Sequence, residues 1–219
     1  VPPKNFSWSD AADDMIAAIE QCSPAGVIGV GHSLGGVMTL IAAAKRPDLF
    51  KQIILIEPMM FPTRAFAQLA WMPMWLRKRV FSLSKRTEKR RAVWDSHDDF
   101  VDSHIGKPAF KGISRTVMAD YAAHGLAMNT ATGQLHHTFP TQWEAHIFRS
   151  PAYAWRALMR LKVPCVCLRA EESQWIPSAS WRKWAKLRPD LPVTVLPKLG
   201  HMAPLQNPEA VAAEVLARL

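Results

Sequence analysis

The residues most suited to chemistry in this 219-residue chain surround one serine. Ser33 lies in GHSLGG, residues 31–36, after the short apolar run AGVIGV and before a helical pattern. A serine at such a strand-to-helix turn is typical of a nucleophile elbow, in which the hydroxyl projects alone from the end of a strand. Gly31 and Gly35 fit a turn too tight for Cβ atoms. The sequence therefore predicts that Ser33 is a nucleophile.

The start of the following helix predicts where a developing negative charge would be stabilised. Leu34 follows Ser33 directly, so its backbone N–H is among the first amide groups of the helix, and these have no partner inside the helix. Such amides, together with the positive end of the helix dipole, stabilise an oxyanion that forms beside the serine. We therefore expect the Leu34 amide to contribute to an oxyanion hole.

A serine hydroxyl needs a base, and one of the eight histidines is well placed to act as one. An imidazole with a pKa of roughly 6.5 can take the serine proton and return it to a leaving group. Among the histidines, only His201 follows a buried strand pattern and precedes a terminal helix. His32 is expected to pack or fix the turn, and the other six histidines show no regular ligand spacing. His201 is therefore the predicted general base.

Four stretches of the sequence resemble the α/β-hydrolase superfamily, and they occur in its order: GHSLGG, IILIEP, VPCVCLRAEES and LPKLGHMAPLQNPEAVAAEVL. The resemblance covers nearly the whole chain. It implies an α/β fold with a mostly parallel sheet of the α/β-hydrolase type, represented by the carboxyl-terminal half of that sheet. It also implies a carboxylesterase-like hydrolase in which Ser33 and His201 belong to a Ser-His-acid triad. No metal or organic cofactor is implied, and a serine nucleophile speaks against dehalogenase or epoxide hydrolase chemistry.

Two glutamates compete for the acid of this triad. The resemblance leads us to expect an aspartate after the strand pattern 163–168, but the chain has AEESQ there, which makes Glu172 a candidate. Glu57 follows the strand pattern 52–56, and some α/β-hydrolases carry their acid at a matching place. An acid at the end of a buried strand is conspicuous because an unpaired buried charge is costly. We expect Glu57 ahead of Glu172, with Glu171 third.

Apolar runs and helical periodicity predict the elements that position these residues. Alternating strands and helices favour an α/β domain with a parallel sheet. We assign residues 1–58 and 163–219 to a partial hydrolase core and 59–162, which has no clear strand pattern, to a helical cap. The predicted strands are 25–30, 52–56, 163–168 and 193–196, and the predicted helices are 11–21 (capped by Ser9 or Asp10), 34–45, 178–187 and 208–219.

The proposed cap is rich in large apolar side chains, which indicates an apolar, ester-like small-molecule substrate. Within this inventory Trp71, Trp75 and Trp143 are the predicted substrate-binding residues.

The cysteine content of the chain indicates an intracellular setting. Three cysteines are too few for a disulfide framework and predict a reducing, cytoplasmic compartment.

The net charge of +9 raises the question of an acidic partner. The densest basic stretch is 75–91, but no nucleic-acid-binding module accompanies it, so nucleic-acid binding is not expected. We favour a solvated outer face of the cap. The alternative is peripheral contact with an anionic membrane, with the tryptophans of WMPMW in the interface.

Only about 32 residues precede Ser33, and they contain no strand or loop to donate the second oxyanion amide found in resembling enzymes. We therefore expect an amino-terminally truncated or partial α/β-hydrolase sequence, with activity weakened or lost. Strand 25–30 would then be an exposed apolar edge, through which copies could form a homo-oligomer. The alternative function is a non-catalytic fragment that binds a lipid surface or a protein partner through its basic cap.

Overall fold

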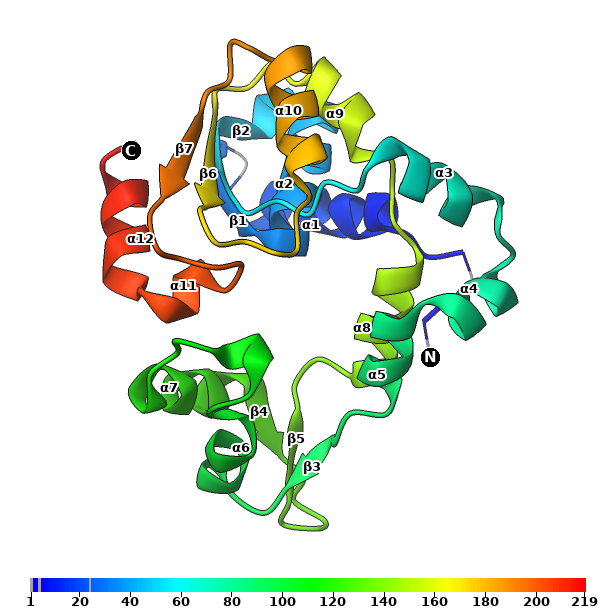
Figure 1. Cartoon of the computed structure of the whole chain (residues 1–219), viewed down its shortest axis with the longest axis vertical. Helices are drawn as coiled ribbons and strands as arrows, with labels where there is room; N and C mark the ends of the chain where they lie inside the picture. Colours follow the sequence, from blue (N-terminus) through cyan, green and yellow to red (C-terminus); the bar gives the residue numbers. More distant parts are fainter. Residues whose placement is uncertain (1, 4, 24) are drawn as a thin grey trace.

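The computed structural model describes residues 2–3, 5–23 and 25–219. Its central feature is a parallel sheet with the strand order β1-β2-β6-β7. Since all neighbouring pairs are parallel, the carboxyl ends of the four strands meet at one edge (Figure 1). The predicted α/β class is confirmed. The strands are β1 (Val27–His32), β2 (Phe50–Ile56), β6 (Cys165–Ala170) and β7 (Val193–Leu196).

Helices cover both faces of this sheet because successive side chains of a strand point to opposite faces. Leu55 and Cys167 pack with α2, α9 and α10 on one face. Ile54 and Leu168 pack with Val211 of α12 on the other, and Figure 1 shows α12 and α10 on opposite sides of the sheet. These helices are α1 (Trp8–Cys22), α2 (Ser33–Lys45), α9 (Ala154–Arg160), α10 (Ser178–Leu187), α11 (Ala203–Gln206) and α12 (Pro208–Leu216), with the 3₁₀ turn η1 (Pro47–Leu49).

The first helix begins earlier than the sequence predicts. α1 starts at Trp8, and Ser7 rather than Ser9 or Asp10 is its N-cap, with Asp10 completing a capping box. The Trp8 side chain is fully buried, and its Nε1–H donates to the backbone carbonyl of Ile147 at 2.8 Å. This contact, from a residue 139 positions away, holds the helix start against the core and is invisible to local periodicity.

The segment 59–162 contains a small antiparallel sheet, in the order β3-β5-β4, that the sequence did not predict. Its strands are two or three residues long, too short for an alternating pattern to be recognised. Trp94 and Phe100 belong to a separate core cluster beside this sheet. The elements are α3 (Thr63–Trp71), α4 (Met74–Val80), α5 (Ser82–Glu88), β3 (Val93–Trp94), α6 (His97–His104), η2 (Pro108–Phe110), α7 (Arg115–Gly125), β4 (Leu126–Met128), β5 (Leu135–His137) and α8 (Thr141–Arg149).

Strand β1 lies at the edge of the parallel sheet, where the sequence predicts an exposed apolar strand. Ile28 and Val30 of this strand are substantially exposed. Cys165 and Cys167 are buried in the core as expected, whereas Cys22 is exposed at the end of α1. Within the described ranges, every helix is too short or too polar to cross a membrane.

Candidate active site

The turn between β1 and α2 holds Ser33 in an unusual backbone conformation. Ser33 has a φ of 53°, in the left-handed region that non-glycine residues rarely occupy. Such a conformation persists only where the surrounding structure enforces it, and it is frequent at functional sites. Here the Ser33 carbonyl accepts a hydrogen bond from the Met59 amide at 3.2 Å, which links the turn to the residues after β2. Ser33 therefore occupies the sharp strand-to-helix corner that the sequence predicts.

Two glycines allow β1 and α2 to meet so closely, but they are not the expected pair. A Cβ atom on Gly31 would lie 2.6 Å from the Gly35 carbonyl oxygen, and one on Gly36 would lie 2.9 Å from the Gly31 carbonyl oxygen. Either contact is too short for real atoms, so Gly31 and Gly36 are required by sterics. At Gly35 a Cβ would meet no atom of the described chain within 4 Å. The predicted steric reason holds for Gly31 and is wrong for Gly35.

Ser33, His201 and Glu57 form a continuous hydrogen-bonded row. Ser33 Oγ lies 2.9 Å from His201 Nε2, and His201 Nδ1 lies 3.2 Å from Glu57 Oε2. His201 comes from the loop between β7 and α11, and Glu57 directly follows β2. Because a carboxylate can only accept, His201 Nδ1–H is the donor to Glu57. This leaves His201 Nε2 as the acceptor for the Ser33 hydroxyl proton.

Glu57 is anchored at both of its carboxylate oxygens. Its side chain is fully buried, and Oε1 accepts a hydrogen bond from the Ala170 amide at 2.7 Å. Glu57 also has a left-handed backbone, with a φ of 47°, which turns the chain sharply after β2. A buried carboxylate with a partner on each oxygen avoids the penalty of an unsatisfied buried charge. Nothing in the sequence pattern indicated this contact with the Ala170 amide.

His32 holds the loop that carries His201. Its Nε2–H donates to the backbone carbonyl of His201 at 2.7 Å, and the two rings lie 5.1 Å apart between centroids. Burial lowers the pKa of His32, which favours the neutral ring. The sequence analysis placed His32 in fixing the elbow turn, whereas its ring hydrogen-bonds the loop of His201.

Gln206 forms a second brace on the same loop, and nothing in the sequence pattern signalled it. Its Oε1 accepts from the Gly200 amide at 2.7 Å, directly before His201. Its Nε2 donates to the Lys111 carbonyl at 2.8 Å. One side chain thus connects the His201 loop to the segment 59–162.

The two acids after β6 lie in a different setting. Glu172 is exposed, and its backbone amide donates to the Leu199 carbonyl at 2.9 Å. Glu171 accepts from the Lys198 amide at 2.9 Å. Both residues therefore fasten their loop to the chain after β7, and within the described residues neither side chain hydrogen-bonds His201.

A cavity of about 470 Å³ opens beside the elbow. Leu34 and Gly35 line it from α2, and Phe139 and Trp143 line it from the segment 59–162. Leu34 is the second residue of α2, so its amide has no acceptor inside the helix. The remaining lining residues are Phe6, Ala11, Asp14, Met38, Pro140 and Ile147.

Of the three tryptophans predicted to bind substrate, only Trp143 lines this cavity. Trp71 and Trp75 are 89% and 67% exposed, on α3 and at the start of α4. Phe6 is a wall residue that the sequence analysis missed, and its ring packs edge-on against Trp143 with centroids 5.2 Å apart. Because Phe6 lies in an irregular loop, no periodicity identified it.

The described residues contain no group of histidines, cysteines and acids arranged to hold a metal ion. What the cluster can do chemically is pass a proton. His201 accepts from the Ser33 hydroxyl while Glu57 holds the ring in one tautomer and stabilises its charged form.

Known proteins that are similar to this chain are named as hydrolases. The 2-(acetamidomethylene)succinate hydrolase of Mesorhizobium japonicum is 29% identical over 216 residues, which is 95% of this chain and 69% of that protein. The crystal structure of E-2-(acetamidomethylene)succinate hydrolase superposes with a TM-score of 0.79 at 23% identity, over 99% of this chain and 75% of that one.

A M. tuberculosis esterase superposes with a TM-score of 0.70 at 18% identity, over 98% of this chain and 70% of its own. These two structural likenesses concern the fold. The sequence model of the alpha/beta hydrolase family matches residues 2–214, nearly the whole chain. The chain therefore belongs to the α/β hydrolase family.

Proposed function

We propose that this protein is a serine hydrolase that cleaves an acyl bond in an ester-like substrate. One observation carries the proposal: Ser33 Oγ lies 2.9 Å from His201 Nε2, and His201 Nδ1 lies 3.2 Å from buried Glu57. Nucleophile, base and orienting acid within hydrogen-bond reach are the arrangement that acyl transfer by serine requires.

In the proposed mechanism Ser33 Oγ attacks the carbonyl carbon as His201 Nε2 takes its proton. The Leu34 amide donates to the oxyanion of the tetrahedral intermediate. His201 then protonates the leaving group, and an acyl group remains on Ser33. Water attacks this ester with His201 again as base, which releases the acid and restores the serine. Glu57 orients the His201 ring and stabilises the imidazolium that forms.

The cavity beside Leu34 supports an apolar acyl or ring-containing substrate. Phe139, Trp143 and Met38 supply apolar walls in the cavity that Leu34 and Gly35 also line. The M. japonicum relative is named for a substrate with an acetamido group. Amides are therefore the second bond class to assay beside esters.

A fluorophosphonate probe and hydrolysis of p-nitrophenyl butyrate test the proposal. We expect stoichiometric labelling and a measurable rate, both abolished by Ser33→Ala. Ser82→Ala is the matched control, because Ser82 is exposed on α5, and it should retain both. A folded sample that neither labels nor turns over ester or amide substrates would contradict catalysis. The same rate measurements test the expectation that the hydrolytic activity of this chain is weakened.

Binding to a lipid surface is the second candidate, and the exposure of Trp71 and Trp75 favours it. α4, which holds Trp75, also carries Arg77, Lys78 and Arg79 in its last turn. Exposed tryptophans and a basic helix are typical of proteins that lie on anionic membranes. Flotation with phosphatidylglycerol vesicles tests this: we expect association at low salt that the double variant Trp71→Ala, Trp75→Ala loses. Equal recovery of both proteins at the bottom of the gradient excludes it.

The homo-oligomer and the cytoplasmic location stay predictions. Exposed Ile28 and Val30 on the edge strand β1 support association of copies. Sedimentation analysis tests it, with Val30→Lys expected to dissociate an edge-paired assembly. Fractionation of cells that produce the protein tests the compartment.

A further inference from the structure

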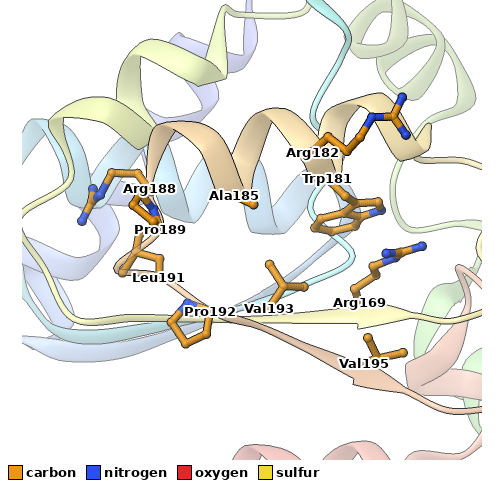
Figure 2. A pocket seen from close by; sticks show the side chains of 10 residues that line it. All are labelled: Arg169, Trp181, Arg182, Ala185, Arg188, Pro189, Leu191, Pro192, Val193 and Val195. Atoms are coloured by element: carbon orange, nitrogen blue, oxygen red, sulfur yellow. The ribbon is translucent and has the colours of Figure 1, made fainter.

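A second cavity, of about 500 Å³, lies between α10 and the strands β6 and β7 (Figure 2). Its lining shares no residue with the candidate active site. Ala185, Val193 and Val195 form an apolar middle section, and Pro192 extends it. The volume is within the range of small-molecule sites, roughly 300–1,000 Å³. An apolar chain or ring of a small ligand would fit along this surface.

One end of this cavity holds two buried donors without a partner. Trp181 is 7% exposed, and its Nε1–H has no hydrogen-bond partner in the described chain. The Nε of Arg169 is likewise buried and unpartnered. Figure 2 shows both side chains at the same end of the cavity, with Arg169 Cζ 5.6 Å from the centre of the Trp181 ring. Buried donors are normally paired, so two together indicate an acceptor supplied from outside.

The same end of the cavity carries positive charge. Among the described residues, Arg169 and Arg182 form no ion pair, and Arg182 donates only to Ser178 Oγ, at 3.0 Å. Arg188, at the opposite end, is already engaged with Asp190 at 2.7 Å and with two backbone carbonyls. Figure 2 shows the Arg182 guanidinium directed away from Arg169, so Arg169 supplies the uncompensated charge beside the unpaired donors.

We propose that this cavity binds a small amphipathic carboxylate. Its head group accepts hydrogen bonds from Arg169 and Trp181, the exposed Arg182 adds only long-range attraction, and its apolar part lies against Ala185 and Val193. A guanidinium offers parallel N–H donors that match a carboxylate. A bare inorganic anion would leave the apolar section of the cavity unoccupied. A ligand with both a carboxylate and an apolar part fills both sections.

Isothermal titration calorimetry with sodium octanoate measures this binding on the full chain. We expect one saturable site for octanoate, with octan-1-ol and octylammonium at least tenfold weaker because they lack the acceptor charge. No saturable octanoate binding, or octan-1-ol binding as tightly as octanoate, overturns the proposal.

Three single variants locate the site. Arg169→Gln should weaken octanoate binding by about tenfold to a hundredfold, since a hydrogen bond to a charged group is lost. Arg182→Gln should weaken it by about threefold or less, because Arg182 is exposed and its charge is screened by solvent. Lys186→Gln is the matched charge control, because Lys186 is exposed on α10 outside the cavity. It should bind within twofold of the unmodified protein.

The variants also separate this site from other sources of binding. Unchanged affinity in Arg169→Gln would place octanoate elsewhere, including the cavity beside Ser33, and would refute the assignment. If Lys186→Gln weakens octanoate binding as much as Arg169→Gln does, the effect is a general attraction to the positively charged surface. That result refutes the proposal as well. Ser33→Ala should bind octanoate as the unmodified protein does.

Discussion

The carboxylate of Glu57 lies 3.2 Å from Nδ1 of His201, although the two residues are 144 positions apart in the sequence. Glu57 reaches this place from the end of β2, the strand next to the one that leads into Ser33. Its second oxygen is held by the Ala170 amide of β6. Three neighbouring strands thus contribute to one row of hydrogen bonds.

Replacing Glu57 by glutamine should lower kcat by about 10³- to 10⁴-fold, because the imidazole loses the carboxylate that sets its tautomer. The matched change is Glu172→Gln, which should stay within about threefold, because Glu172 is exposed and its backbone rather than its side chain holds its loop. Ester hydrolysis under saturating substrate gives both values. Loss of turnover in the Glu172 variant alone would transfer the role to that residue.

Two glycine substitutions should separate folding from catalysis. Gly31→Ala should reduce the free energy of unfolding by about 3 kcal/mol or more, because the new Cβ would lie 2.6 Å from a backbone oxygen. Gly35→Ala should leave stability unchanged or raise it by up to about 1 kcal/mol, because alanine favours the helix and meets no atom.

Gly35 nevertheless lines the cavity beside the elbow, so its variant should hydrolyse long acyl esters less well than short ones. Urea denaturation and a series of p-nitrophenyl esters measure the two effects. A destabilised Gly35→Ala protein would show that the elbow is tighter than the geometry indicates.

Trp143→Ala should lower kcat/KM for p-nitrophenyl hexanoate by about tenfold or more, and for the acetate much less. The reason is that removing the indole takes away apolar contact area for the acyl chain only. Trp75→Ala is the comparison, since its ring is 67% exposed and outside the cavity. Steady-state kinetics on both esters decide the matter. An equal effect on acetate and hexanoate would argue that Trp143 acts through the fold.

Acid should destabilise the protein through His137. Burial, with a smaller contribution from the charge of Arg90, lowers the pKa of His137 from 6.5 to about 4. Between pH 6.5 and 4 the unfolded chain therefore takes up a proton that the folded chain refuses, so the free energy of unfolding falls as the pH falls through this window and is constant above it.

Thermal unfolding measured from pH 8 to 4 tests this, with His137→Phe expected to flatten the decline. His104 stacks on Phe100 in the same cluster, and burial lowers its pKa too, so part of the slope should persist. His136→Phe, at the exposed neighbouring position, is the control and should keep the full pH dependence. A stability that rises on acidification would be incompatible with a neutral buried ring.

Local pattern predicted much of the architecture. The predicted helix 178–187 and strand 193–196 coincide with α10 and β7. The periodicity of an amphipathic helix reflects burial on one side, and a short apolar run reflects a strand buried on both faces. The turn at Ser33 was equally readable, since its glycines are adjacent to it in the chain. The strands of β3, β4 and β5 were not, because two or three residues cannot display a period.

The sequence by itself determined the α/β class, the strand-to-helix corner at Ser33 and the candidacy of His201, since each depends on residues that are close in the chain. Tertiary structure alone decided that Glu57 rather than Glu172 lies against His201. It also decided that Trp143, and not Trp71 or Trp75, faces the cavity. The physical reason is that both outcomes depend on which strand ends and helix faces the fold brings together. The type of a single residue does not specify which distant residue will lie against it.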